Sequence, residues 1–169
     1  MFKCLILALA LSISSQSNAN SFIFSKSSNF EKATYHELQG NNEMAEYHYI
    51  QSSKEGNPYA SYKLWAMYVS LSKNNDEYFE KANPYLIKAA YGGVFYAQLS
   101  RAKIHLSSNH YPEAYIWANV AMKNRNKILS KKDKEDLVKI INDSKFHLNP
   151  DEQKEVHLKI DAYNERTYK

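Results

Sequence analysis

Small apolar residues recur at helical spacing through the middle of the chain. Between Ala82 and Ala90, apolar side chains occupy positions i, i+4, i+7 and i+8, which places them on one face of a helix. Gly93 follows at a point where a helix end favours a residue that tolerates positive φ. A second apolar series begins at Ala97. The pattern predicts two helices that fold back on each other, with small residues at their interface.

The same spacing occurs once earlier in the chain and, in part, once later. In each of the first two copies an alanine precedes a glycine by 11 residues and a second alanine by 15, and the copies are offset by 37 positions. Ala114 and Ala121 begin a third, partial copy. A repeat of this length built from paired helices predicts an all-α fold, an α/α solenoid of about two to three hairpins, because one hairpin cannot bury its apolar face alone.

Helix-capping and helix-ending residues set the expected bounds of the other elements. The chain has only four glycines and four prolines, and no long alternation of apolar and polar residues argues for a sheet. We expect residues 29–129 to form the repeat region and residues 130–169 to cap it with two helices. The expected helices are 29–39, 43–54, 58–72, one that begins near Glu80, one from 97 to 106, 111–124, 130–146 and 150–164.

The repeat resembles the Sel-one-like repeat family, a relative of the tetratricopeptide repeat. The family unit runs roughly A-x-x-W-x-x-x-A-A-x-x-G-x-x-x-A-x-x-x-L-G-x-x-Y, and the resemblance covers about residues 43–124. It implies helical hairpins that scaffold or regulate other proteins. The matching residues are Ala82, Tyr85 at the Trp position, Ala89, Ala90, Gly93 and Ala97 in one copy, Ala45, Gly56, Ala60, Leu64 and Tyr68 in the earlier copy, and Ala114, Trp117 and Ala121 in the last.

Two departures from the family pattern involve polar residues. Ser52 and Ser53 stand where the unit has its alanine pair, and Arg101 and His105 hold the leucine and tyrosine positions of the central copy. The copies are therefore degenerate.

The N-terminal residues have the layout of a secretory signal peptide. Lys3 supplies a positive charge, a short apolar run follows, and small residues precede a cleavage point after Ala19. A membrane anchor is the alternative, but the apolar run is shorter than the ~20 residues that span a bilayer. We expect residues 1–19 to be removed, residues 20–28 to form a flexible lead, and the protein to be exported, most simply to a bacterial periplasm. Cys4, the single cysteine, lies within the signal, so the mature chain has no thiol and no disulfide.

Composition and motifs argue against several classes of chemistry. The net charge of +4 is too small and too evenly spread to favour nucleic-acid binding. The six histidines are scattered and form no HExxH run, and the chain has no Gly-rich phosphate loop and no G-x-S-x-G turn. We therefore expect no catalytic residues, no metal site and no cofactor, and no stable membrane insertion after signal cleavage.

A tyrosine-rich surface remains as the candidate site. The chain has fourteen tyrosines and seven phenylalanines, and tyrosine provides large contact area with little loss of side-chain entropy. In paired-helix solenoids the first helix of each unit lines the concave side. The candidate partner-binding residues on those helices are Tyr47, His48, Gln51, Tyr85, Lys88, Tyr91, Tyr115 and Asn119.

Three functions compete at this point. The first is a non-enzymatic protein that binds another protein or peptide through its concave face. The second is a periplasmic immunity protein that neutralises a secreted toxin, a role that the family resemblance implies for some members. The third is a cell-wall-directed hydrolase, which the absence of an acid–base or nucleophile set disfavours. The sequence leaves the partner and the oligomeric state open.

Overall fold

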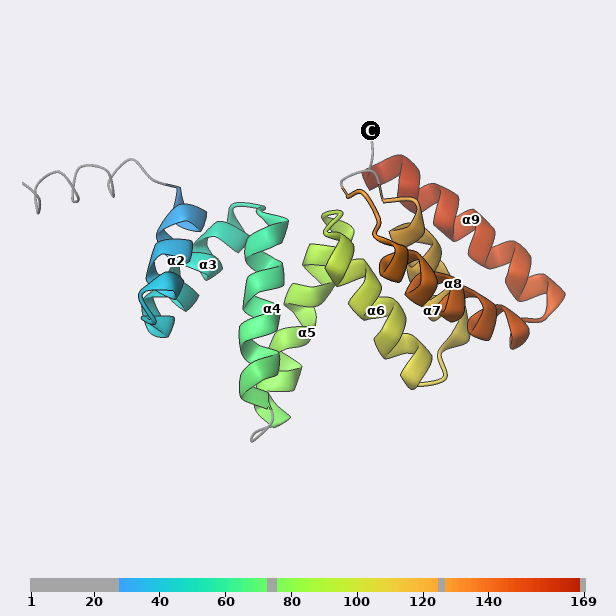
Figure 1. The fold of residues 1–169 in the computed structure, drawn as a ribbon, viewed down its shortest axis with the longest axis horizontal. Coiled ribbons are helices and arrows are strands. Elements are labelled where there is room, and N and C mark those ends of the chain that lie inside the picture. The colour runs from blue at the N-terminus through green and yellow to red at the C-terminus, as the bar shows by residue number, and fades with distance from the viewer. Residues whose placement is uncertain (1–27, 73–75, 125–126, 168–169) are drawn as a thin grey trace, which may run out of the picture. The chain divides into compact units, whose positions relative to one another are not determined.

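In the computed structural model, every regular element of the described residues (28–72, 76–124 and 127–167) is an α-helix, which confirms the all-α prediction (Figure 1). The chain divides into two compact units, residues 1–52 and residues 53–169, which are described separately below. Residues 1–27, which hold the expected signal peptide and most of the expected lead, lie outside the described part. The helices are α2 (Asn29–Leu38), α3 (Asn42–Lys54), α4 (Pro58–Ser72), α5 (Asp76–Tyr91), α6 (Phe95–Ser107), α7 (Tyr111–Met122), α8 (Lys131–Phe146) and α9 (Pro150–Thr167).

Most helix bounds agree with the sequence expectation to within three residues. The exception is α5, which begins at Asp76 rather than near Glu80 and carries Pro84 in its interior. A proline inside a helix removes one backbone donor and is costly. The first turn has compensating contacts, because the ring of Tyr78 stacks on Tyr68 of α4 with ring centroids 6.2 Å apart. The additional first turn of α5 therefore packs on α4 through an aromatic contact.

Side-chain contacts join the two helices of the first unit. Ala33, Ala45 and Tyr49 are fully buried, and the ring of Phe30 on α2 lies 5.8 Å from that of Tyr49 on α3. The Tyr49 hydroxyl donates a hydrogen bond of 2.6 Å to the carboxylate of Glu37, and burial raises the pKa of that hydroxyl well above its ordinary value. The buried ring of Tyr49, whose hydroxyl is hydrogen-bonded, thus holds α3 against α2.

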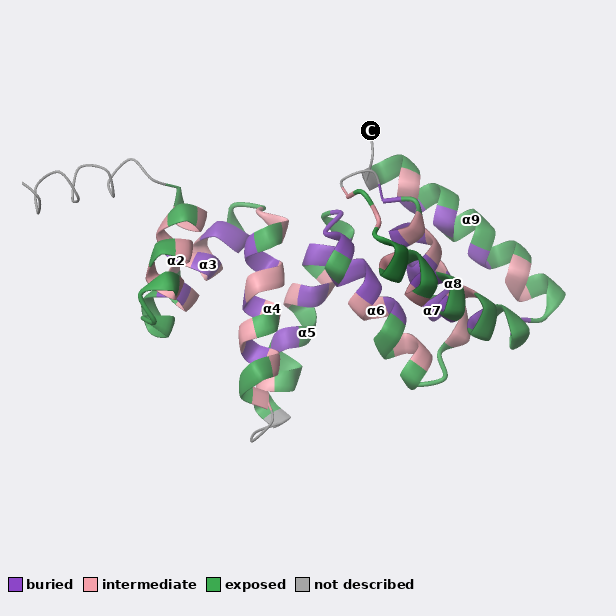
Figure 2. Cartoon of the chain, in the orientation of Figure 1, coloured by how far each residue is buried: buried purple, intermediate pink, exposed green. Residues whose placement is uncertain are grey.

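The second unit is built around α5, α6 and α7. The helix α4 packs on α5, α6 packs on α7, and α8 and α9 both pack on α7. Figure 2 shows buried residues concentrated on α6 and α7, whereas α9 is buried along one side only. The largest apolar cluster contains Leu86, Ala89, Ala90, Val94, Phe95, Ala97, Leu99, Ala102, Ala114, Trp117, Ala118, Val120, Ala121, Leu137, Ile140 and Tyr163. Its many alanines allow the close helix approach that the sequence predicted.

Glycine turns end α3 and α5 in the same way. Gly56 and Gly93 have φ values of 97° and 80°, a left-handed conformation that favours glycine. Gly92 has a different role, because a Cβ atom built there would lie 2.3 Å from the Cβ of Pro58 at the start of α4. The sequence predicted the turn glycine Gly93 from its spacing, but it gave no sign of the contact at Gly92.

A buried polar network closes the turn between α5 and α6. The backbone carbonyl of Ala90 accepts hydrogen bonds from the amide N–H of Gly93 (3.1 Å), from Nε2 of Gln98 (3.2 Å) and from the hydroxyl of Tyr163. Nδ2 of Asn124 donates to Oε1 of Gln98 (2.7 Å) and to the carbonyl of Gly93 (3.0 Å). Carbonyls at a helix end lack intrahelical donors, so side chains from α6, from the end of α7 and from α9 supply them here.

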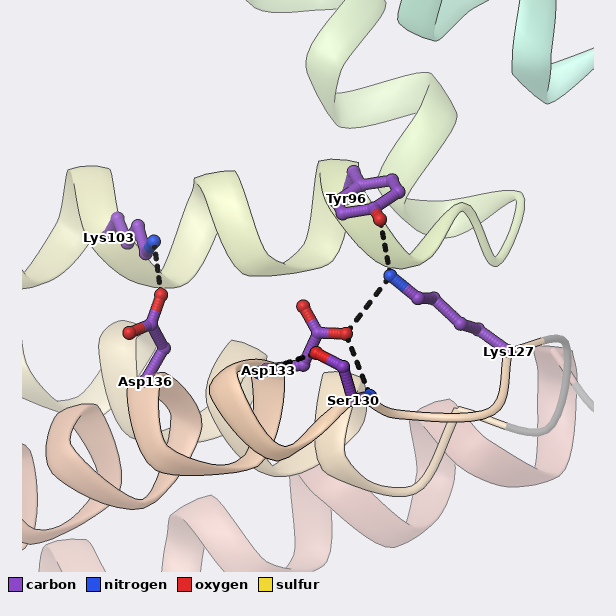
Figure 3. A network of polar contacts seen from close by, with 6 residues as sticks. All are labelled: Tyr96, Lys103, Lys127, Ser130, Asp133 and Asp136. Carbon is purple, nitrogen blue, oxygen red and sulfur yellow. Dashed lines mark hydrogen bonds and ion pairs between the residues drawn. The ribbon is translucent and has the colours of Figure 1, made fainter.

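A second polar network joins α6 to the start of α8 (Figure 3). Ser130 and Asp133 form a capping box, in which each backbone amide donates to the side chain of the other residue at 3.0–3.1 Å. The ammonium of Lys127 lies 3.1 Å from Asp133 and also contacts the hydroxyl and ring of Tyr96 on α6. Lys103 and Asp136 add an exposed ion pair of 2.9 Å. These contacts orient α8, the first of the two helices expected to cap the repeats.

Candidate functional site

An open pocket of about 520 Å³ lies in the second unit, where the end of α5 meets α6, α7 and α9. We call it the Arg101 pocket. Its charged side chains are three cations and one carboxylate: Arg101, Lys159, Arg166 and Glu113. Its other lining residues are Tyr91, Ile116, Trp117, Ala162 and Tyr163. The volume and the mixture of aromatic and charged walls are typical of binding sites.

Three aromatic rings form one wall of the Arg101 pocket. The ring of Trp117 meets Tyr91 and Tyr163 edge to face, with centroids 5.2 Å and 5.1 Å away, and Tyr91 and Tyr163 lie 5.4 Å apart. Trp117 is only 4% exposed, whereas Tyr91 is 57% exposed. The wall is therefore rigid at its base and accessible at its rim.

The guanidinium of Arg101 lies against this wall. Its Cζ atom is 4.7 Å from the centroid of the Trp117 ring, which is a cation–π contact. Its Nη2 atom is 3.2 Å from Nε2 of His105, and its Nε atom is buried without a hydrogen-bond partner among the described residues. Burial lowers the pKa of Arg101, and Tyr91 and Tyr163 oppose the shift. An arginine nevertheless stays protonated in proteins, so the pocket holds a permanent positive charge.

A second cavity, of about 280 Å³, opens on the other side of Arg101. It lies between α4, α5 and α6 and is lined by Trp65, Phe79, Leu86, Ile104, His105 and other residues of those helices. Burial lowers the pKa of His105, and the positive charge of Arg101 lowers it further. Glu113 raises that pKa and His110 lowers it, with smaller effects. At neutral pH the uncharged His105 therefore accepts a hydrogen bond from Arg101.

This arrangement predicts a loss of stability in mild acid. A histidine whose folded pKa lies below its unfolded value binds its proton first in the unfolded chain. The stability that His105 contributes to the folded protein is therefore complete above its unfolded pKa of about 6.5. This stability is lost as the pH falls through that value toward the folded pKa. Urea unfolding at pH 7.5 and pH 5.0 measures the difference in stability. Tryptophan fluorescence can follow the unfolding of the second unit, since Trp65 and Trp117 both lie in it. His105→Gln should reduce the pH dependence. An equal pH dependence in His105→Gln and the wild-type protein would contradict the assignment.

The predicted site residues on α3 have different environments. Tyr47 is 54% exposed, as expected of a contact residue. His48 is half-buried: its Nδ1 atom lies 3.2 Å from Oδ1 of Asn29, and its ring stacks on His36 at 5.6 Å. Gln51 is also half-buried. These three residues belong to the first unit.

The predicted residues on α5 are only partly available for contact. Tyr91 is exposed and lines the Arg101 pocket. Lys88 is exposed, but its ammonium donates to the backbone carbonyl of Ser53. Tyr85 is half-buried, with its ring 5.7 Å from that of Tyr68. Of the three, only Tyr91 belongs to the pocket.

Of the two predicted site residues on α7, Tyr115 was expected to be exposed, and this prediction is wrong. It is 6% exposed and packs with Val156 and Ile160 of α9, because the C-terminal helix covers this side of α7. Asn119 is half-buried and donates through Nδ2 to the carbonyl of Tyr115 at 2.9 Å. These two positions therefore stabilise α7 locally.

Sequence reasoning missed Arg101, His105 and Tyr163 as site residues. Arg101 and His105 had appeared only as departures from the repeat pattern, where a leucine and a tyrosine were expected. That departure is the signal that could have found them, since a charged residue at an apolar repeat position needs a reason. Tyr163 had no such signal, because only the fold brings α9 to the end of α5.

The described residues present neither a metal cluster nor a membrane span. No three histidine, cysteine, aspartate or glutamate side chains among them gather closely enough to hold a metal ion. None of the helices in the described ranges is long and apolar enough to cross a bilayer. The chain matches no protein-family model, no curated protein and no solved structure.

Proposed function

We propose that this protein binds another protein or peptide through the Arg101 pocket and acts by binding rather than by catalysis. The observation that carries the proposal is the pocket itself. It combines an exposed tyrosine, a buried tryptophan and a half-buried arginine on three helices whose packing holds them in place. Aromatic and arginine side chains dominate the energetics of protein interfaces.

The proposal includes a Sel-one-like, tetratricopeptide-like α/α solenoid in an exported protein. The left-handed glycines Gly56 and Gly93, 37 residues apart, and the packing of α4 on α5 and of α6 on α7 support successive hairpins. The buried Ser52 and Ser53, at the place of the alanine pair, support a repeat with polar substitutions, since Ser53 hydrogen-bonds Ser61 at 2.8 Å. Export, with the periplasm as destination, rests on the signal-like sequence of residues 1–19.

Crosslinking from the source cells tests the binding surface. Tyr91→Ser removes the exposed ring from the rim of the pocket, while Tyr59→Ser removes an equally exposed ring (53%) from α4, outside the pocket. We expect a partner that crosslinks to the wild-type protein and to Tyr59→Ser but is lost with Tyr91→Ser. Tyr47→Ser, in the first unit, tests the other exposed tyrosine predicted from the sequence.

Circular dichroism establishes that the variants keep their helices. Capture of the same proteins by all four forms would place the binding surface elsewhere. A turnover activity of the purified protein that a point mutation abolishes would overturn the proposal of a non-catalytic role.

A further inference from the structure

The positive charge of Arg101 is not neutralised by a carboxylate of the described residues. The guanidinium makes a polar contact with the uncharged His105 and a cation–π contact with Trp117. Glu113 lines the same pocket but forms no ion pair with it. Placing a cation in partly apolar surroundings without an anion is costly. The arrangement is therefore favourable when a ligand supplies the anion.

The neighbouring charges indicate which anion fits. Lys159 is already paired with Glu155 at 2.6 Å, and Arg166 lies at the exposed rim. Glu113 places one negative charge in the pocket, which repels a dianion such as a phosphate group more strongly than a monoanion. A carboxylate carries one charge and matches the guanidinium in planar, paired hydrogen bonds.

The aromatic wall indicates what should accompany the carboxylate. Trp117 lies directly beneath the guanidinium, and the exposed ring of Tyr91 extends the apolar surface to the rim. A chain that crosses the open pocket places an acidic side chain on Arg101 and an apolar neighbour on the exposed ring of Tyr91.

We propose that the Arg101 pocket receives the carboxylate of a glutamate or aspartate side chain of a protein partner, with apolar residues flanking it. This inference rests on the proposed binding function and names the chemistry that the pocket selects. Arg101 is the anchoring residue, the exposed ring of Tyr91 contacts a flanking side chain, and the buried ring of Trp117 supports the guanidinium.

Three acetylated tripeptides test the inference on the full chain. The first is acetyl-Leu-Glu-Leu-amide; the second, acetyl-Leu-Gln-Leu-amide, has nearly the same shape without the charge; the third, acetyl-Leu-Gln-Leu with a free terminal carboxylate, moves the charge to the chain end. The chain has two tryptophans, so the indole N–H signals in a ¹H–¹⁵N NMR spectrum report separately on Trp117 and on Trp65 of the second cavity. Each peptide is titrated to millimolar concentration, and Trp65→Phe assigns the two signals.

We expect the glutamate peptide to shift the Trp117 signal and to bind roughly 10-fold or more tightly than the glutamine peptide, as charge-assisted hydrogen bonds predict. Arg101→Gln should abolish this preference, and Arg101→Lys should retain part of it. Lys103→Gln, on the same helix but outside the pocket, is the matched control. A well-dispersed ¹H–¹⁵N spectrum of Arg101→Gln shows that the variant is folded, and Arg101→Lys provides the test if it is not.

The possible outcomes separate this inference from the proposed function. Equal binding of the glutamate and glutamine peptides overturns the carboxylate inference while leaving a binding pocket. Tighter binding of the free-acid peptide than of the glutamate peptide overturns the choice of an acidic side chain. A shift of Trp65 without Trp117 overturns the choice of pocket, and no shift with any peptide overturns the inference altogether. The crosslinking comparison at Tyr91 then decides on the proposed function independently.

Discussion

Replacing Tyr163 by alanine should lower the free energy of unfolding of the second unit by about 3–5 kcal/mol, the range for large aromatic residues removed from a core. Tyr163 is 8% exposed, its ring contacts Tyr91 and Trp117, and its hydroxyl donates to the carbonyl of Ala90. The substitution therefore removes the contacts through which α9 holds the end of α5. Urea unfolding followed by circular dichroism measures the loss.

Two further variants separate the ring from its hydroxyl. Tyr163→Phe keeps the ring and should cost only about 1 kcal/mol, because the Ala90 carbonyl retains other donors. Tyr59→Ala removes an exposed ring (53%) and should change stability by less than about 0.5 kcal/mol. If Tyr163→Ala were no more destabilising than Tyr59→Ala, α9 would not be an essential part of this core.

Replacing Gln98 by alanine should destabilise the second unit nearly as strongly. Gln98 is fully buried, and its amide joins the carbonyl of Ala90 to the side chain of Asn124. Its loss leaves the Asn124 amide with one acceptor fewer, which costs about 1–3 kcal/mol for a buried polar group, and the cavity adds to that cost. Urea unfolding followed by circular dichroism measures the total.

Gln98→Met keeps most of the volume of the side chain and removes its hydrogen bonds, so it isolates the polar part of the effect. Ser100→Ala, a smaller change at a half-buried position of the same helix, is the control. A Gln98→Met protein as stable as the wild type would show that the network around Ala90 contributes little.

The helices could be predicted from the sequence because their signals are local. Ser130 precedes α8 by one residue, Pro58 opens α4, and Gly93 ends α5, each for a reason contained in a few neighbouring residues. The start of α5 could not be predicted in the same way. Its first turn contacts α4 through Tyr78 and Tyr68, which are ten residues apart in the sequence and lie on different helices.

The candidate site depended on contacts that no local pattern reveals. Tyr115 and Tyr91 were both predicted to be exposed on the first helix of a repeat, yet α9 buries the first and leaves the second exposed. Arg101 could be recognised as unusual in its repeat position, but its neighbours Trp117 and Tyr163 come from other helices. Sequence periodicity therefore predicted which residues lie on a helix face, and not which of those faces α9 covers.

The hydrogen bond between Tyr163 and Ala90 spans 73 residues of sequence. A ribosome that adds ~5–20 residues per second needs roughly 4–15 s to synthesise that interval. The ring of Trp117 is synthesised during this interval, and until Tyr163 follows it lacks the α9 side chain that packs against it. A molecular chaperone that recognises exposed aromatic side chains would thus have its best opportunity to bind the chain before translation reaches α9.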